Sequence, residues 1–277
     1  MADRVFFSNF ALLSHFLITM KKIVVLLSFL SIGLIVNAQK LILDPSFVLG
    51  LPSGDFKNNT DAVGFGLGTA IMYQPATMPV AFGLDGNFQV YGSNTQKEVL
   101  TATITVGNTV IDHINIPLRI TTENTIFNLN GIVRVTPEWA HVRPFIDGLI
   151  GFRNIATTTS IYDESTNYQY AKDDNGLIVK KKQLGDYVFS YGGALGVMVD
   201  VGKTEKISIQ LKGSYTVGGK ADYFDGSDTK NWKVEFTGTD PSNIEGDDLN
   251  YTVTPRHSTT DMITIHLGVA FRIPLNK

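Results

Sequence analysis

Three residues near the C-terminus carry the side chains that a serine hydrolase would need: His257, Ser258 and Asp261. Such chemistry requires a nucleophile, a base and a group that orients the base, all in contact. Adjacent residues of an extended chain point to opposite faces, so His257 is not expected to activate Ser258. The sequence also lacks the G-x-S-x-G turn that exposes a catalytic serine. We therefore expect no catalytic residue and no enzyme activity.

A second candidate is a cluster of carboxylates in the segment DYFDGSD and the residues after it. Its members are Asp222, Asp225, Asp228, Glu235, Asp240, Glu245, Asp247 and Asp248. Several carboxylate and carbonyl oxygens together can bind calcium, but these residues lack the spacing of an EF-hand loop. We expect a solvated acidic loop, with no metal site and no cofactor.

The composition narrows the choice of function further. The chain has no cysteine, which excludes disulfides, thiol nucleophiles and cysteine-bound zinc. Its formal net charge is −3, so no basic footprint for nucleic acid is expected. Glycine and aromatic residues are frequent, while charged residues make up only 18% of the chain. This composition is typical of an exported β protein.

The N-terminus has the layout of a secretory signal peptide. Met20 is followed by two lysines and by the apolar stretch Ile23–Val36, and the small residue Ala38 marks a cleavage site. Residues 1–38 are therefore predicted to be removed, which leaves Gln39 as the first mature residue, and Met20 is an alternative start. A helical anchor is the competing interpretation, but the apolar run is shorter than the roughly 20 residues of a helical span.

Tyr187–Val217 shows the clearest structural pattern of the chain. Apolar residues alternate with small or polar ones as far as Asp200, then GKTEK intervenes, and the alternation resumes at Ile207. A period of two over ten or more residues predicts strands with one apolar and one polar face. Runs of this length exceed ordinary soluble strands and match strands that cross a bilayer at a tilt.

Eight such strands are predicted along the chain. They are Ser46–Leu51, Val63–Tyr73, Val80–Tyr91, Ile126–Val135, Val142–Arg153, Tyr187–Asp200, Ile207–Val217 and Asp261–Ile273. Short links alternate with longer ones, and the three longest are residues 92–124, 154–186 and 218–260. Tight turns on one rim and long extracellular loops on the other are typical of outer-membrane barrels. The predicted fold is all-β: a transmembrane up-and-down antiparallel β-barrel of eight strands, formed by residues 39–277.

The barrel must close, because an unpaired backbone group in hydrocarbon costs several kcal/mol, and eight strands leave an interior that side chains fill. Glycines 64, 66, 68, 192, 196 and 268 fall on the inward register. Charged residues share this register: Asp85, Arg134, Asp200, Lys212, His266 and Arg272. We expect these charges to pair inside the lumen, since an unpaired buried charge is very costly. A large open pore is therefore not expected.

Several short motifs resemble one family. LPSGDF at 51–56, VRPFIDGLIG at 142–151 and LGVAFR at 267–272 are similar to motifs of small outer-membrane barrels of the porin-family or OmpA/OmpX-like type, common in Bacteroidetes-type Gram-negative bacteria. The resemblance implies an outer-membrane location and an eight-stranded barrel. It does not imply one activity, since members of the family include structural, adhesion, secretion-associated and lipid-modifying proteins.

The loops are the expected functional surface, as loops on a rigid scaffold often are. Residues 101–116 form two alternating runs around Gly107-Asn108, which predicts a hairpin above the membrane; if that hairpin crossed the membrane, the barrel would have ten strands. Asn175-Gly176 predicts a tight turn that lets its strands continue outward. We expect a monomer in contact with outer-membrane lipid and lipopolysaccharide, whose loops bind an unknown extracellular ligand or protein. The alternatives are an envelope-assembly or secretion accessory, a small-solute conduit and a lipid-modifying enzyme.

Overall fold

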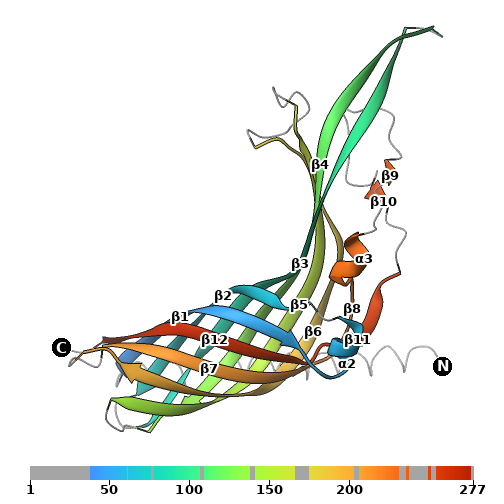
Figure 1. Cartoon of the computed structure of the whole chain (residues 1–277). Coiled ribbons are helices and arrows are strands. Elements are labelled where there is room, and N and C mark those ends of the chain that lie inside the picture. Colours follow the sequence, from blue (N-terminus) through green and yellow to red (C-terminus); the bar gives the residue numbers. More distant parts are fainter. Residues whose placement is uncertain are drawn as a thin grey trace, which may run out of the picture.

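A computed structural model describes residues 38–275 except 61, 76–77, 107–108, 138–140, 166–174, 203–205, 231–234, 237–248 and 251–253. Its main body is a closed antiparallel barrel of eight strands, in the order β1-β12-β7-β6-β5-β4-β3-β2 (Figure 1). Each strand pairs with its neighbours in the chain, and β12 closes the ring onto β1. The predicted eight-stranded up-and-down barrel is confirmed. The predicted signal peptide lies almost wholly outside the described residues.

Five of the eight barrel strands are much longer than the sequence pattern indicated. They are β1 Ala38–Pro52, β2 Gly64–Pro75, β3 Val80–Val106, β4 Thr109–Val135, β5 Val142–Asp163, β6 Leu177–Asp200, β7 Ile207–Gly218 and β12 Met262–Pro274. β3 and β4 each have 27 residues, far more than the roughly 9–11 that a tilted transmembrane strand needs. Their outer halves therefore lie beyond the barrel.

The strand register fixes the shape of the barrel. Partner residues followed once around the ring lead from Ile42 through Met72, Gly83, Ile132, Leu149, Gly192, Thr216 and Met262 back to Pro52. Pro52 lies ten residues beyond Ile42 on the same strand, which gives a shear of ten. For eight strands, a shear of this size means strongly tilted strands around an interior that side chains can fill.

Glycines on the inward register let this narrow interior close. A Cβ atom at Gly66 would overlap the carbonyl oxygen of Phe88, and one at Gly192 would overlap that of Tyr215. These positions therefore require glycine for close approach of neighbouring strands. The predicted inward placement of glycines on these two strands is confirmed.

Two of the three predicted long loops are mostly strand. Residues 92–106 of β3, 109–124 of β4, 154–163 of β5 and 177–187 of β6 continue the barrel wall outward, and we refer to these four segments as the projecting sheet (Figure 1). The hairpin around 101–116 belongs to it and pairs as a continuation of β3 and β4. The alternative of ten membrane strands is therefore wrong. The expectation that the loop at 154–186 continues its strands outward is confirmed.

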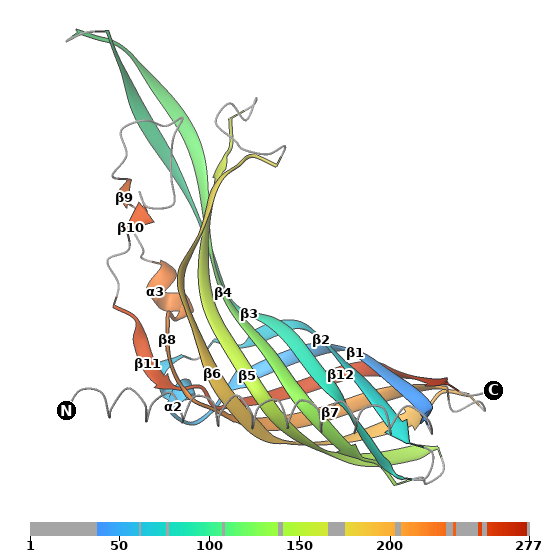
Figure 2. The same cartoon turned by 180° about the vertical axis from the view of Figure 1, so that it is seen from behind.

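Other short elements gather at the mouth of the barrel. The segment after β1, expected as a plain turn, contains the helix α2 (Gly54–Asn59). The last long segment contains β8 (Lys220–Tyr223), α3 (Gly226–Lys230), β9 (Glu235–Phe236), β10 (Leu249–Asn250) and β11 (Arg256–Thr259). β8 pairs with β11, and both lie near α2 at one end of the barrel, opposite the C-terminus (Figures 1 and 2). None of the helices described is long and apolar enough to cross a membrane.

Candidate functional site: a sealed lumen and a projecting sheet

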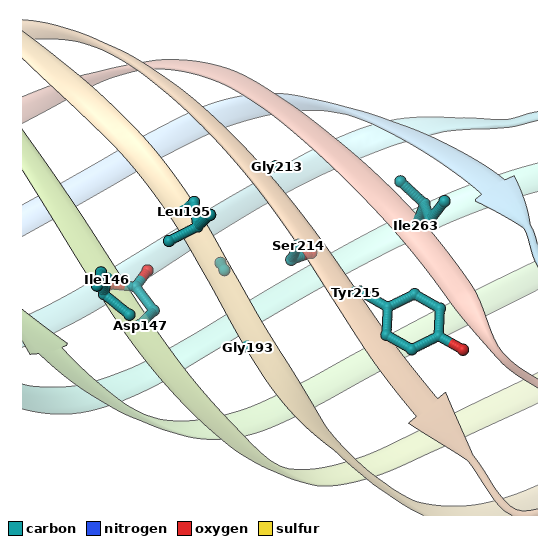
Figure 3. A pocket seen from close by; sticks show the side chains of 9 residues that line it. Ile146, Asp147, Gly193, Leu195, Gly213, Ser214, Tyr215 and Ile263 are labelled. Carbon is teal, nitrogen blue, oxygen red and sulfur yellow. The ribbon is translucent and has the colours of Figure 1, made fainter.

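The exterior of the barrel is apolar. Many large side chains on the outward register are more than half exposed: Phe47, Leu67, Leu84, Ile146, Ile150, Leu195, Leu211 and Leu267. Ile146, Leu195, Tyr215 and Ile263 surround a groove of about 440 Å³ whose floor contains the bare backbone of two glycines (Figure 3). Soluble proteins rarely expose so large an apolar surface. This surface is therefore expected to contact the hydrocarbon chains of lipids.

An aromatic belt marks one end of this apolar surface. Phe65, Phe88, Phe127, Phe152, Phe189, Tyr191 and Tyr215 are exposed on neighbouring strands, at similar levels near the mouth of the barrel. Aromatic girdles of this kind lie at the membrane–water interfaces of barrel proteins. The belt therefore marks where the barrel leaves the hydrocarbon, and the projecting sheet begins above it.

The interior contains a buried ion cluster around Arg134. Its Nε donates to Asp147 Oδ1 at 2.7 Å, and its Nη1 donates to Asp44 Oδ2 at 2.8 Å and to Gln210 Oε1 at 3.0 Å. The guanidinium also lies 3.9 Å from the ring centroid of Phe145. Arg134, Asp44 and Asp147 are at most 2% exposed. This cluster joins β1, β4, β5 and β7 across the lumen.

A second ion pair lies beside this cluster. Lys212 Nζ donates to Asp85 Oδ2 at 2.6 Å, and both residues are less than 5% exposed. His266 is the strand partner of Lys212, and its Nδ1 lies 3.3 Å from Ser46 Oγ. The lumen is therefore filled by hydrogen-bonded groups at this level as well.

The third cluster lies at the end of the barrel that holds the C-terminus. Asp200 accepts hydrogen bonds from Arg143 Nη2 and Arg272 Nη1, both at 2.9 Å, and from Ser208 Oγ at 2.6 Å. Two arginines thus share one carboxylate. The predicted pairing inside the barrel is confirmed for Asp85, Arg134, Asp200, Lys212 and Arg272, with the specific partners now assigned. Among the described residues His266 contacts the Ser46 hydroxyl and forms no ion pair.

An apolar cap closes the other end of the lumen. Phe56, on α2, is fully buried and forms edge-to-face contacts with Tyr223 at 5.0 Å and with Tyr91 at 6.4 Å between ring centroids. Met262 belongs to the same buried cluster. Below the cap, Arg153 donates to Asn128 at 2.7 Å and to Thr216 at 2.6 Å, and also contacts the carbonyl of Thr260. The cap and this layer separate the charged lumen from the outside.

Asp225 ties the cap to the surrounding loops. It accepts hydrogen bonds from Thr60 and Ser227, and Arg256 lies 3.6 Å from it and donates to Asp228 at 2.8 Å. Burial by itself raises the pKa of Asp225, but the hydrogen bonds from Ser227 and Thr60 and the charge of Arg256 lower the pKa below its ordinary value. The expectation of a solvated acidic loop is therefore wrong for Asp225, which is only 9% exposed. Asp240, Glu245, Asp247 and Asp248 lie outside the described residues.

The residues considered for hydrolase chemistry do not form a triad. His257 Nδ1 lies 2.6 Å from Asp222 Oδ1 on an exposed face, whereas the Ser258 hydroxyl is buried and lies 2.7 Å from the hydroxyl of Tyr223. Asp261 accepts the backbone N–H of Gly218 instead. The expectation that His257 and Ser258 point to opposite sides of the strand is confirmed.

The projecting sheet has two different faces. On its inner face, continuous with the lumen, Ile116, Leu118, Ile120 and Ile161 are at most 2% exposed. Its outer face, continuous with the barrel exterior, is polar and charged. Thr95 and Thr121 share a hydrogen bond of 3.3 Å there, and Arg119 lies 4.2 Å from the ring centroid of Tyr162. The sheet is therefore an ordered structural unit above the barrel.

Sequence patterns missed four charged residues of the lumen. Asp44 lies before Ser46, where the alternation predicts the first strand to begin, whereas β1 begins at Ala38. Arg143, Asp147 and Arg153 were missed because the alternation of β5 is interrupted by Pro144 and glycines. The sequence nevertheless holds the signal of a two-faced strand, since the apolar residues Val142, Ile146, Ile150 and Phe152 share one register. The structure exposes all four on the outside of the barrel.

The fold and its surface define a small transmembrane β-barrel of the outer-membrane type. No family model and no curated protein matches the sequence. Among solved structures, Neisserial surface protein A has 9% identity and a TM-score of 0.37, over 84% of this chain and 95% of that one. The attachment invasion locus protein Ail of Yersinia pestis, in complex with the heparin analogue sucrose octasulfate, has 10% identity and a TM-score of 0.32, over 86% and 99%. A major outer membrane protein of Thermus thermophilus has 14% identity and a TM-score of 0.38, over 84% and 98%.

Proposed function

We propose that this chain is a monomeric, non-catalytic outer-membrane protein that acts by binding through its projecting sheet. The observation that carries the proposal is the length of β3 and β4, 27 residues each. Their outer halves add nothing to the membrane span and pair with each other as far as Val106 and Thr109. An ordered sheet held outside the bilayer by a rigid barrel is suited to binding a partner.

The state of the lumen favours binding over transport. Three ion clusters and an apolar cap lie along the axis of the barrel. Barrels that conduct solutes have wider interiors, with 16 or more strands. The role of a small-solute conduit therefore has less support than a binding role.

The proposal is tested with a variant that lacks only the outer part of the hairpin. Asn94 and Thr122 are strand partners, so an Asn-Gly turn can join them in place of residues 95–121. A strain lacking this protein is complemented with the full chain or with the trimmed chain, and adhesion, envelope integrity and secretion are measured. We expect the full chain alone to restore the lost property. If the trimmed chain, present at equal amounts in the outer membrane, restores it fully, the projecting hairpin is not the functional part.

A further inference from the structure

The outer face of the projecting sheet carries an excess of positive charge, although the whole chain is acidic. Lys97, Arg119, Lys180 and Lys182 lie on this face, and Glu123 and Glu164 oppose them. Glu164 pairs with Lys97 at 3.0 Å and with Arg119 at 3.2 Å. No carboxylate among the described residues forms an ion pair with Lys180 or Lys182. Within the described part of the chain, the two exposed ammonium groups on β6 therefore have no ion-pair partner.

A β-bulge places these two lysines on the outer face. Thr157 pairs with Leu184 and Thr158 pairs with Lys182, so Gln183 is an extra residue in β6. The extra residue reverses the alternation of side chains along β6. Lys182 and Lys180 therefore lie on the same face of the sheet as Tyr187, which is closer to the barrel. The Lys182 ammonium lies 5.4 Å from the ring centroid of Tyr187, which confirms that both side chains share this face.

The position of the lysines relative to the bilayer follows from the aromatic belt. Phe189 and Tyr191 belong to the belt, and Tyr187, 71% exposed, comes next along β6. Lys182 and Lys180 follow five and seven residues further along β6, and the Lys182 side chain reaches back toward the Tyr187 ring. Charged groups immediately above an aromatic belt lie at the level of lipid headgroups.

The direction of the sheet brings its outer face toward the membrane. The projecting sheet leaves the barrel at a steep angle to the barrel's long axis, and α3, β9 and β10 lie on its side away from the C-terminus (Figures 1 and 2). The inner face, with buried Ile116 and Leu118, is on that covered side. The outer face therefore looks back along the barrel wall toward the surface of the bilayer.

We propose that Lys180 and Lys182 bind the phosphate groups of an outer-leaflet glycolipid, lipopolysaccharide, and so hold the projecting sheet against the membrane surface. Basic residues close to an anionic lipid surface are attracted to it, and lysine can extend its long side chain along apolar surface to reach a phosphate. This inference rests on the outer-membrane placement proposed above and assigns a lipid partner to the sheet.

The test measures the affinity of the full chain, in non-ionic detergent, for fluorescently labelled lipid A by fluorescence anisotropy. Lys180→Gln/Lys182→Gln should weaken binding at least about tenfold, since each basic residue near an anionic surface contributes roughly fivefold. Lys40→Gln/Lys206→Gln removes the same charge at the opposite end of the barrel and should leave the affinity unchanged. Lys180→Arg/Lys182→Arg should retain binding, and the difference between wild type and the glutamine variant should shrink in high salt.

Lipid A without phosphates supplies the decisive comparison, because wild type and the glutamine variant should then bind it equally. The proposal is overturned if the glutamine variant binds phosphorylated lipid A with the affinity of wild type. It is equally overturned if the Lys40/Lys206 control loses as much affinity as the Lys180/Lys182 variant. It is also overturned if the glutamine variant loses affinity for soluble heparin but not for lipid A, since the lysines would then serve a soluble polyanion. The trimmed hairpin variant keeps both lysines, so failure of the binding function and failure of the lipid contact are distinguishable.

Discussion

Lys212 Nζ donates a hydrogen bond to Asp85 Oδ2 at 2.6 Å inside the barrel, although 127 residues separate the two in the chain. β7 and β3 do not pair with each other, so the two residues meet only because the sheet closes. The contact is therefore a direct consequence of barrel closure, and it is sensitive to loss of either partner.

Lys212→Met should lower the free energy of unfolding by about 3–5 kcal/mol, because it leaves the Asp85 carboxylate buried without a counter-charge. Urea titration of the chain in lipid vesicles, followed by heat-dependent gel mobility, measures the loss. The double variant Lys212→Met/Asp85→Asn removes both charges and should recover most of the stability. Equal losses in the single and double variants would show that the pair is not coupled.

Leu211→Lys should destabilise the barrel by about 2–4 kcal/mol, because it places a charge on the lipid face near mid-membrane. Leu211→Ala, which removes bulk without adding charge, is the control and should cost less. The facing itself is measured with spin labels on single cysteines, which the cysteine-free chain makes simple. Labels at 209 and 211 should respond to lipid-soluble oxygen, whereas one at 210 should not, and equal responses would contradict the strand register.

The purified protein should show no stable, porin-sized steps in planar bilayers, because paired charges and the cap fill the lumen. Phe56→Ala should weaken the cap by about 3–5 kcal/mol but should not open a channel, since the Arg134 cluster lies further inside. Single-channel recordings of wild type and variant decide the matter. Regular porin-sized steps from wild type would refute the sealed lumen and favour a conduit.

Acidification should weaken the contacts that hold α2 and the loops around the cap. The pKa of Asp225 is lowered in the folded state, so its contribution to stability is present above its ordinary pKa of about 4 and is lost as the pH falls through the lower, folded value. Hydrogen exchange of α2, corrected for intrinsic rates, should therefore rise below about pH 4. Asp225→Asn should show weaker protection at neutral pH and a smaller change on acidification; an unchanged acid response would exclude Asp225 as the cause.

The mature protein should begin at Gln39 and fractionate with the outer membrane. N-terminal sequencing of the exported chain identifies the cleavage site, and Ala38→Leu should block or shift it, because a small residue is required there. The protein should also stay folded in mild SDS until heated. Recovery from the soluble periplasm would contradict the membrane placement.

Much of this architecture was predictable from residue order alone. Alternation along Ile207–Val217 predicted β7 almost to its ends, and the inward register of Asp85, Arg134 and Lys212 followed from the same period of two. The outer half of β3 was less predictable, because polar residues such as Thr95 and Gln96 occupy both of its faces and give no apolar alternation. Helix α2 lies where the sequence predicts a turn, because six residues carry too little periodicity to identify a helix.

The sequence by itself determined which residues face the lipid and which face the lumen, because side-chain direction in a strand depends only on position along the chain. It also determined that the lumen charges had to pair. Only the tertiary structure decided the partners, such as Arg134 with Asp44 and Asp147, because pairing across the lumen depends on the shear of the closed barrel. Only the tertiary structure also decided which lysines lie on the outer face of the projecting sheet, because one bulge at Gln183 reverses the alternation along β6.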